Sequence, residues 1–180
     1  MSLHISLVSI QGNHLSEIAG VLEDCEYIVE DSFTVKSGDQ VSEELGWNPD
    51  RNRVAKAAYF AHGWTYIIDP ELVLLINDVW LKYSRKWNNR IFGWICEGVS
   101  GTYGITVFDS GNKRRVVVSV DGEVVTDEGK PLKEETDLDW NDVWETDILG
   151  LAKRIGAVYD FPADRDYQII HLDESQMSAP

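Results

Sequence analysis

The chain has 180 residues, the length of one ordinary domain, and a chain of this size buries roughly 70% of its unfolded surface. Its composition is 43% hydrophobic and 26% charged, which excludes an intrinsically disordered protein. Because 31 acidic residues stand against 16 Lys and Arg, the formal net charge is -15, and this charge disfavours nucleic-acid and anionic membrane partners. We therefore expect one acidic, folded domain that binds neither nucleic acid nor membranes.

The N-terminal residues and the cysteines indicate a cytoplasmic protein. Residues 1–10 lack the basic start and the long apolar stretch of a secretory signal, and no apolar run approaches the roughly 20 residues of a membrane helix. Cys25 and Cys96 lie far apart in the sequence, with no His or Cys spaced as a zinc ligand, so we expect buried free thiols. The absence of an Asn-x-Ser/Thr acceptor agrees with a cytoplasmic location.

The first part of the chain predicts a strand, a helix and a second strand. Residues 3–10 and 26–35 contain β-branched and aromatic residues in partial alternation, which is typical of strands. Between them, apolar residues recur three and four positions apart behind Asn13, a good helix N-cap. Residues 36–53 are polar and interrupted by Gly and Pro, so we expect a loop there with Trp47 as its only anchor.

The next part predicts a hairpin and the longest helix. Residues 54–68 are ambiguous because their alanines favour a helix, whereas their aromatic residues and the His-Gly break at 62–63 favour a hairpin. We choose the hairpin. Asp69 can then cap a helix, Pro70 suits its first position, and apolar residues recur every three or four positions over residues 72–87.

The second half predicts an antiparallel meander followed by one helix and one strand. Residues 127–138 form a charged connector, Thr146 can cap a last helix that ends at Gly156, and residues 167–172 read as a final strand. The meander consists of four short strand-like segments separated by turn signals, at residues 91–99, 102–111, 114–120 and 122–126.

These elements predict an α+β fold. We expect a single domain over residues 1–173, built on a mainly antiparallel sheet with about three helices, and a frayed tail over residues 174–180.

Motifs for catalysis, cofactors and metals are absent from the sequence. There is no glycine-rich phosphate loop, and Ser100 does not lie in a G-x-S-x-G elbow. The four histidines, His4, His14, His62 and His171, are scattered without metal-ligand spacing. We therefore expect no cofactor and no metal, and a binding protein rather than an enzyme.

An acidic segment at residues 127–147 is the sharpest local feature. Nine acidic residues against Lys130 and Lys133 leave a net charge of -7 in these 21 residues. The segment lacks the glycine and the bidentate Glu of a calcium loop. It is either a solvated surface or a docking surface for a basic protein, with a tryptophan as its anchor. The residues predicted to contact such a partner are Glu134, Glu135, Asp137, Asp139, Trp140, Asp142 and Trp144.

Three segments carry a resemblance to known proteins. AAYFAHGWTYIIDPE at 57–71, SGTYGITVFDSGNKRR at 100–115 and GKPLKEE at 129–135 resemble poorly characterised bacterial α+β proteins, some of which are similar to immunity proteins of polymorphic toxin systems. The resemblance includes no catalytic signature and assigns no residue a role. It implies a small acidic intracellular protein that blocks a toxin by surface complementarity. The acid excess agrees with this independently, and a basic toxin or nuclease is the partner that it would suit.

Two other functions remain open. One is an enzyme or small-ligand binder whose site is assembled from distant residues around the aromatic hairpin at 59–66, including His62 and Trp64. The other is a structural subunit, which would carry a large exposed hydrophobic patch.

Overall fold

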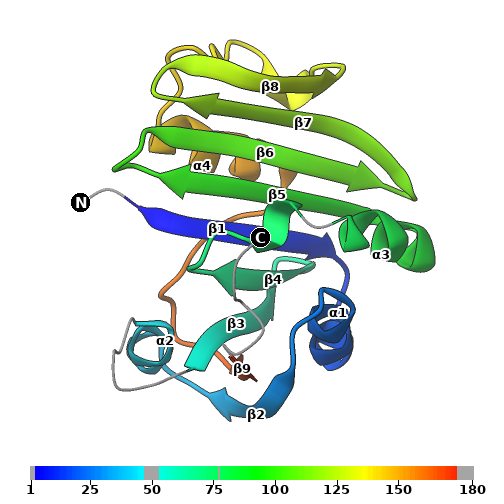
Figure 1. Cartoon of the computed structure of the whole chain (residues 1–180), viewed down its shortest axis with the longest axis vertical. Helices are drawn as coiled ribbons and strands as arrows, with labels where there is room; N and C mark the ends of the chain where they lie inside the picture. The colour runs from blue at the N-terminus through cyan, green and yellow to red at the C-terminus, as the bar shows by residue number, and fades with distance from the viewer. Residues whose placement is uncertain (1–2, 47–52, 77, 174–180) are drawn as a thin grey trace.

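All strands in the described part of the chain belong to one antiparallel sheet. The computed structural model describes residues 3–46, 53–76 and 78–173. Within these ranges the sheet has nine strands in the order β2-β9-β3-β4-β1-β5-β6-β7-β8 (Figure 1). The strands are β1 (His4–Gln11), β2 (Val29–Val35), β3 (Arg53–Ala61), β4 (Trp64–Asp69), β5 (Arg90–Glu97), β6 (Thr102–Asp109), β7 (Asn112–Val120), β8 (Glu123–Gly129) and β9 (Tyr167–Asp173).

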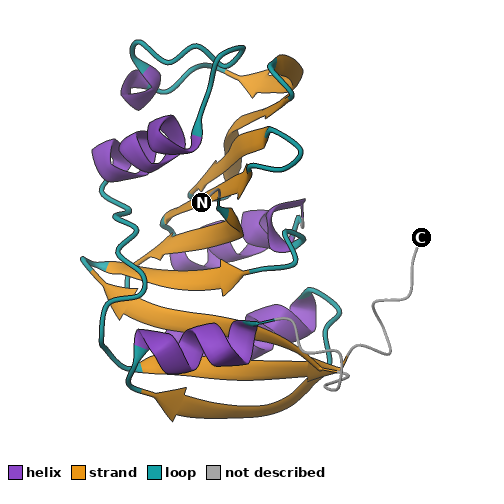
Figure 2. Cartoon of the chain, turned by 90° about the vertical axis from the view of Figure 1, so that its left-hand side faces the viewer, coloured by secondary structure: helices purple, strands orange, loops and turns teal. Residues whose placement is uncertain are grey.

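Helices cover both faces of the sheet. In the described ranges the four α-helices are α1 (Ile18–Asp24), α2 (Gly38–Leu45), α3 (Val79–Trp87) and α4 (Glu145–Ile155). Buried residues of α2 and α4 join the core on one face, whereas those of α1 and α3 join the core on the other. In Figure 1, α4 lies behind β6 and α3 lies in front of the sheet, and Figure 2 shows the same layers from the side. No helix in the described part of the chain is long and apolar enough to cross a membrane.

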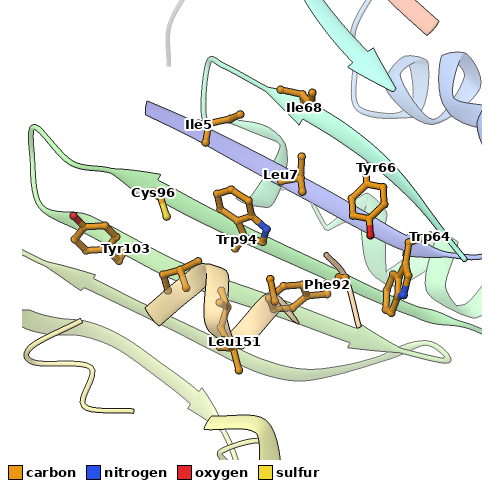
Figure 3. Packing of buried hydrophobic residues seen from close by; sticks show 14 of the residues in the cluster. Ile5, Leu7, Trp64, Tyr66, Ile68, Phe92, Trp94, Cys96, Tyr103 and Leu151 are labelled. Atoms are coloured by element: carbon orange, nitrogen blue, oxygen red, sulfur yellow. The ribbon is translucent and has the colours of Figure 1, made fainter. Parts of the chain in front are cut away.

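The central strand β1 contributes to both cores. Leu7 is buried on the α4 side of the sheet, and Val8 is buried on the α3 side. A strand buried on both faces normally reads as a nearly continuous apolar run, but β1 also contains Ser6 and Ser9, which are fully buried polar residues. On the α4 side, Tyr66, Trp94 and Leu151 lie together above the strands (Figure 3).

The structure confirms the predicted strands and the α+β class with an antiparallel sheet. The ambiguous segment is a hairpin of β3 and β4, whose turn residues His62 and Gly63 have φ of 52° and 81°. The Asp121 and Gly122 turn between β7 and β8 has φ of 49° and 80°, as expected of residues that tolerate a left-handed backbone.

The expectation of about three helices is corrected to four, because the predicted loop at 36–53 contains α2. The Ser37 side chain caps α2 by accepting a hydrogen bond from Asp39 N at 3.1 Å, and Val41 is fully buried. A helix this short shows too few apolar repeats to be recognised from periodicity. Trp47, the predicted anchor, lies outside the described residues.

The predicted start of the long helix is also wrong. Asp69 is the last residue of β4 rather than a helix cap, and its buried carboxylate pairs with Lys56. It also accepts a hydrogen bond from Leu74 N at 2.8 Å, and Leu74 is the first residue of a short 3-10 helix at Leu74–Ile76. Helix α3 therefore begins only at Val79.

The last helix begins one residue before the predicted cap. Trp144 is its N-cap residue, and Trp144 N donates to Asp147 Oδ2 at 2.9 Å. Thr146 consequently lies inside α4, which ends before Gly156 in the left-handed region, as predicted.

The two cysteines are buried free thiols, one in each core. Burial raises the pKa of both Cys25 and Cys96 to about 12, so neither sulfur is an activated nucleophile.

Candidate functional site

The acidic segment divides into a buried inner part and an exposed outer part. Glu135 belongs to the inner part and is only 7% exposed. Its carboxylate accepts hydrogen bonds from Arg115 Nε at 2.9 Å, Trp140 Nε1 at 3.0 Å and Leu132 N at 2.8 Å. Trp140 is likewise buried. Glu135 and Trp140 are therefore removed from the predicted contact surface, because their polar atoms are used within the protein.

Arg115 is the reason for this burial. Its side chain is 2% exposed and also pairs with Asp127. Burial opposes the charged form of Arg115, but hydrogen bonds to Glu135 and Asp127 outweigh this effect and raise its pKa. The sequence contained a signal for this pair that we missed. Arg115 shares its strand face with Val117 and Ser119, which are buried, and an inward-facing Arg requires a buried counter-charge.

In the outer part, three acidic residues of the predicted contact set stay at the surface. Asp137, Asp139 and Asp142 are exposed, whereas the side chain of Glu134 is largely covered. Asp139 Oδ1 accepts a hydrogen bond from Asn141 N at 2.9 Å, which orders the turn before α4. The structure therefore retains Asp137, Asp139, Asp142 and Trp144 as the exposed members of the predicted set.

Trp144 presents its indole ring to solvent. It is 62% exposed, and its Nε1 donates to Asp142 Oδ1 at 3.2 Å. The backbone N–H of Trp144 donates a hydrogen bond to Asp147 Oδ2. The side chain of the next residue, Glu145, accepts a hydrogen bond from Leu3 N at 2.9 Å through its Oε2. The polar edge of the ring is thus satisfied, and its apolar faces remain available for a partner.

A hollow of about 340 Å³ lies beside Trp144. It is bounded by the turns at 98–101 and 121–122 and by residues 141–144. Asp121 N donates to Gly101 O at 3.1 Å and joins the two turns. At the rim, Val99 is 90% exposed. Sequence reasoning missed these turn residues, because nothing in residues 98–122 indicates that they meet the start of α4.

The charges around the hollow are negative. Of its described lining residues, Asp121 and Asp142 are acidic and none is cationic. Tyr103 also lines the hollow, and burial raises its pKa, so its phenol stays neutral. We call Val99, Asp121, Asp139, Asp142 and Trp144 the Trp144 surface. A carboxylate pair beside an aromatic face is suited to a Lys or Arg side chain.

The aromatic hairpin at 59–66 forms a different arrangement. Tyr59 and Tyr66 are fully buried and stack with ring centroids 4.7 Å apart, and burial raises the pKa of Tyr66 to about 12. His62 Nε2 lies 3.0 Å from Asp160 Oδ2, which also accepts from Arg165 Nη2 at 2.5 Å. The contacts of His62 and Arg165 with Asp160 join the turn of the hairpin to the segment before β9. The rings of Tyr59 and Tyr66 are part of the hydrophobic core.

Neither a metal cluster nor a known relative identifies the site. In the part of the chain that the structure describes, no group of three or more His, Cys, Asp or Glu is arranged to hold a metal ion. Comparison of the chain with protein-family models, curated proteins and solved structures found no match. The candidate site is therefore defined by the geometry and charge of the Trp144 surface.

Proposed function

We propose that the protein is a non-catalytic binding protein that captures a basic segment of another protein at the Trp144 surface. The observation that carries the proposal is an indole 62% exposed to solvent and a valine 90% exposed, beside a hollow whose described charges are all acidic. Large exposed apolar side chains next to a hollow are typical of interaction sites.

The chemistry of the hollow favours a Lys or Arg side chain of the partner. Such a group would lie against Trp144 and be neutralised by Asp121 and Asp142. A cation on an indole face contributes about 0.5–2 kcal/mol, with the larger value when water is excluded. The net charge of -15 would attract a basic partner over a longer range and raise its association rate.

An inhibitor of the immunity type would use such a surface. A basic toxin or nuclease binds phosphate groups with clustered Lys and Arg, and an acidic protein that covers this cluster prevents substrate from binding. The acid excess and the resemblance to immunity proteins both support this role. The mechanism would be occlusion, with Trp144 as the anchor that slows dissociation.

The experiment is a binding measurement with an identified partner. The tagged protein is incubated with lysate of its own host at low salt, and a recovered protein is then expressed, purified and tested by surface plasmon resonance. We expect Trp144→Ala to weaken the affinity about 30-fold, the effect of losing one interface hot spot. Asp121→Asn combined with Asp142→Asn should lower the association rate and flatten its salt dependence.

A charge-matched variant controls for nonspecific attraction. Glu23→Gln combined with Glu43→Gln removes the same two charges from exposed positions on α1 and α2, and it should leave dissociation unchanged. The proposal is refuted if Trp144→Ala binds as tightly as the wild type. It is also refuted if both double variants slow association equally, because the attraction would then follow net charge alone.

A further inference from the structure

A second pocket lies on the face of the sheet opposite α4. It has a volume of about 310 Å³ and lies over the middle of β6, where Figure 1 shows no described helix in front of the strand. Ile95, Val116 and Val118 line it from the sheet and are only half-buried. A solvated face of an antiparallel sheet normally carries polar residues, so this apolar lining requires an explanation.

Two glycines give the pocket its depth. A Cβ on Gly104 would lie 2.8 Å from Val117 O and 3.1 Å from Val118 Cγ2, so the floor stays open only because β6 has no side chain there. On β5, a Cβ on Gly93 would lie 2.0 Å from Leu75 Cδ2. Gly93 therefore lets Leu75 pack directly onto the sheet and form a wall of the pocket.

Leu72 completes this wall with an unusual backbone conformation. Its φ is 62°, in the left-handed region that non-glycine residues seldom adopt. Leu72 and Leu75 both line the pocket, on the segment between β4 and α3. Leu72 and Leu75 thus lie beside a half-buried apolar part of the sheet and form one side of the pocket without filling it.

The charges at the pocket disfavour an anionic ligand, and its largely apolar lining disfavours any charged ligand, because burying a charge among apolar groups is costly. Lys113 and Asp78 are its only charged described lining residues and have opposite signs. Lys113 Nζ also lies 3.5 Å from Glu128 Oε2, so its charge is already balanced. An anion would be repelled by a chain with a net charge of -15. Thr102 Oγ1 already shares a hydrogen bond with Ser100 Oγ at 2.8 Å, so a polar atom of a ligand would bond to the Thr106 hydroxyl or to the remaining hydrogen-bonding capacity of Thr102.

Size and charge also argue against a second copy of the chain. Two identical concave faces would leave a void between them and lose van der Waals contacts, and both copies would carry the same net charge of -15. An apolar cavity of about 150 Å³ accommodates benzene. A pocket of about 310 Å³ therefore has room for roughly two fused rings.

We propose that this pocket binds a neutral, flat, apolar small molecule of about two fused rings with one hydroxyl or carbonyl group directed at Thr102 or Thr106. The probe is naphthalen-2-ol, and naphthalene-2-carboxylate serves as its anionic counterpart. Binding is followed through the methyl resonances of the wild-type protein in two-dimensional NMR. We expect saturable shifts in the methyl groups of Leu75, Ile95, Val116 and Val118, and at least tenfold weaker binding of the carboxylate.

A pair of matched variants tests the location. Thr106→Phe places a ring in the pocket and should weaken naphthalen-2-ol binding at least tenfold, and Phe is well tolerated in strands. Thr34→Phe makes the same change at an exposed position of β2 and should leave binding unchanged. Trp144→Ala should also bind the probe normally, because the proposal does not depend on the Trp144 surface.

Several results would overturn the proposal. One is the absence of saturable shifts with either probe, and another is a set of shifts centred on the methyl groups of Val99 and Val143, beside Trp144, instead of those of Val116. Normal binding by a folded Thr106→Phe variant would contradict it equally. If that variant does not fold, the methyl shifts of the wild type decide alone. Sedimentation velocity completes the test, because a wild-type dimer that Thr106→Phe converts to monomer would assign the face to a second copy.

Discussion

Removing the carboxylate of Glu135 should destabilise the protein more than removing any exposed acidic residue of its segment. In a Glu135→Leu variant, the buried Arg115 loses its main counter-charge, and Trp140 Nε1 and Leu132 N lose their acceptor. Breaking a buried ion pair by removing one partner costs about 3–5 kcal/mol. For a domain of this size, each kcal/mol lowers the Tm by roughly 2–4 °C, so the expected decrease is roughly 6–20 °C.

The assay is differential scanning calorimetry together with urea denaturation, and two variants make it specific. Glu128→Leu removes an exposed acid from β8 whose partner Lys113 is 3.5 Å away, and it should cost less than about 1 kcal/mol. Arg115→Met combined with Glu135→Leu removes both buried charges and should recover at least half of the lost stability. A cost below about 1 kcal/mol for Glu135→Leu would refute the reasoning, because Asp127 and solvent would then suffice for Arg115.

Two further predictions concern acid stability and glycine. Hydrogen bonds, first from Lys86, lower the pKa of Glu17 from 4.5 to about 2. Charged Glu17 therefore stabilises the fold above about pH 4.5 and loses this effect as the pH falls towards 2, so Glu17→Gln should flatten the acid limb of Tm against pH. Both glycine variants change a helix residue. Gly20→Ala should raise the free energy of unfolding by about 0.5–1 kcal/mol, since a Cβ at residue 20 meets nothing within 4 Å. Gly38→Ala should lower the free energy of unfolding, because a Cβ at residue 38 would lie 2.2 Å from Pro162 O. Urea denaturation measures the free energy of unfolding of the two glycine variants, and equal changes in the two would contradict the argument from the space around each Cβ.

Strands and their turns were predictable because the responsible residues are local. The strand-like segments at 102–111, 114–120 and 122–126 and the turn signals between them are each contained in a few consecutive residues, and β6, β7 and β8 follow from them. The start of α3 was not predictable in the same way. Asp69 and Pro70 form a good local helix start, but pairing with Lys56 of a neighbouring strand keeps Asp69 at the end of β4.

The acidic segment exposes the same limit in the candidate site. Its net charge could be read from the sequence, but the role of each acid depends on Arg115, which is 20 residues from Glu135 in the chain. The alternation along β7 can indicate that Arg115 points inward. Nothing local in the sequence indicates that Glu135 is its partner, because the two residues meet only in the folded chain. The hollow beside Trp144 is formed by the connecting loops of two hairpins together with residues 141–144, so no local sequence pattern could indicate it.

The buried residues Glu135 and Trp140 have a different role from the exposed Trp144 surface, and stability and binding measurements on two variants can distinguish the two roles. Glu135 and Trp140 hold the segment that leads to α4, whereas Asp142 and Trp144 face solvent. We therefore expect Glu135→Gln to lower both stability and partner affinity, because it loosens the chain that positions Trp144. Asp142→Asn should lower affinity at unchanged Tm, since Asn retains an acceptor for Trp144 Nε1. A variant of Glu135 that loses stability but binds the partner normally would show that the Trp144 surface does not depend on this buried support.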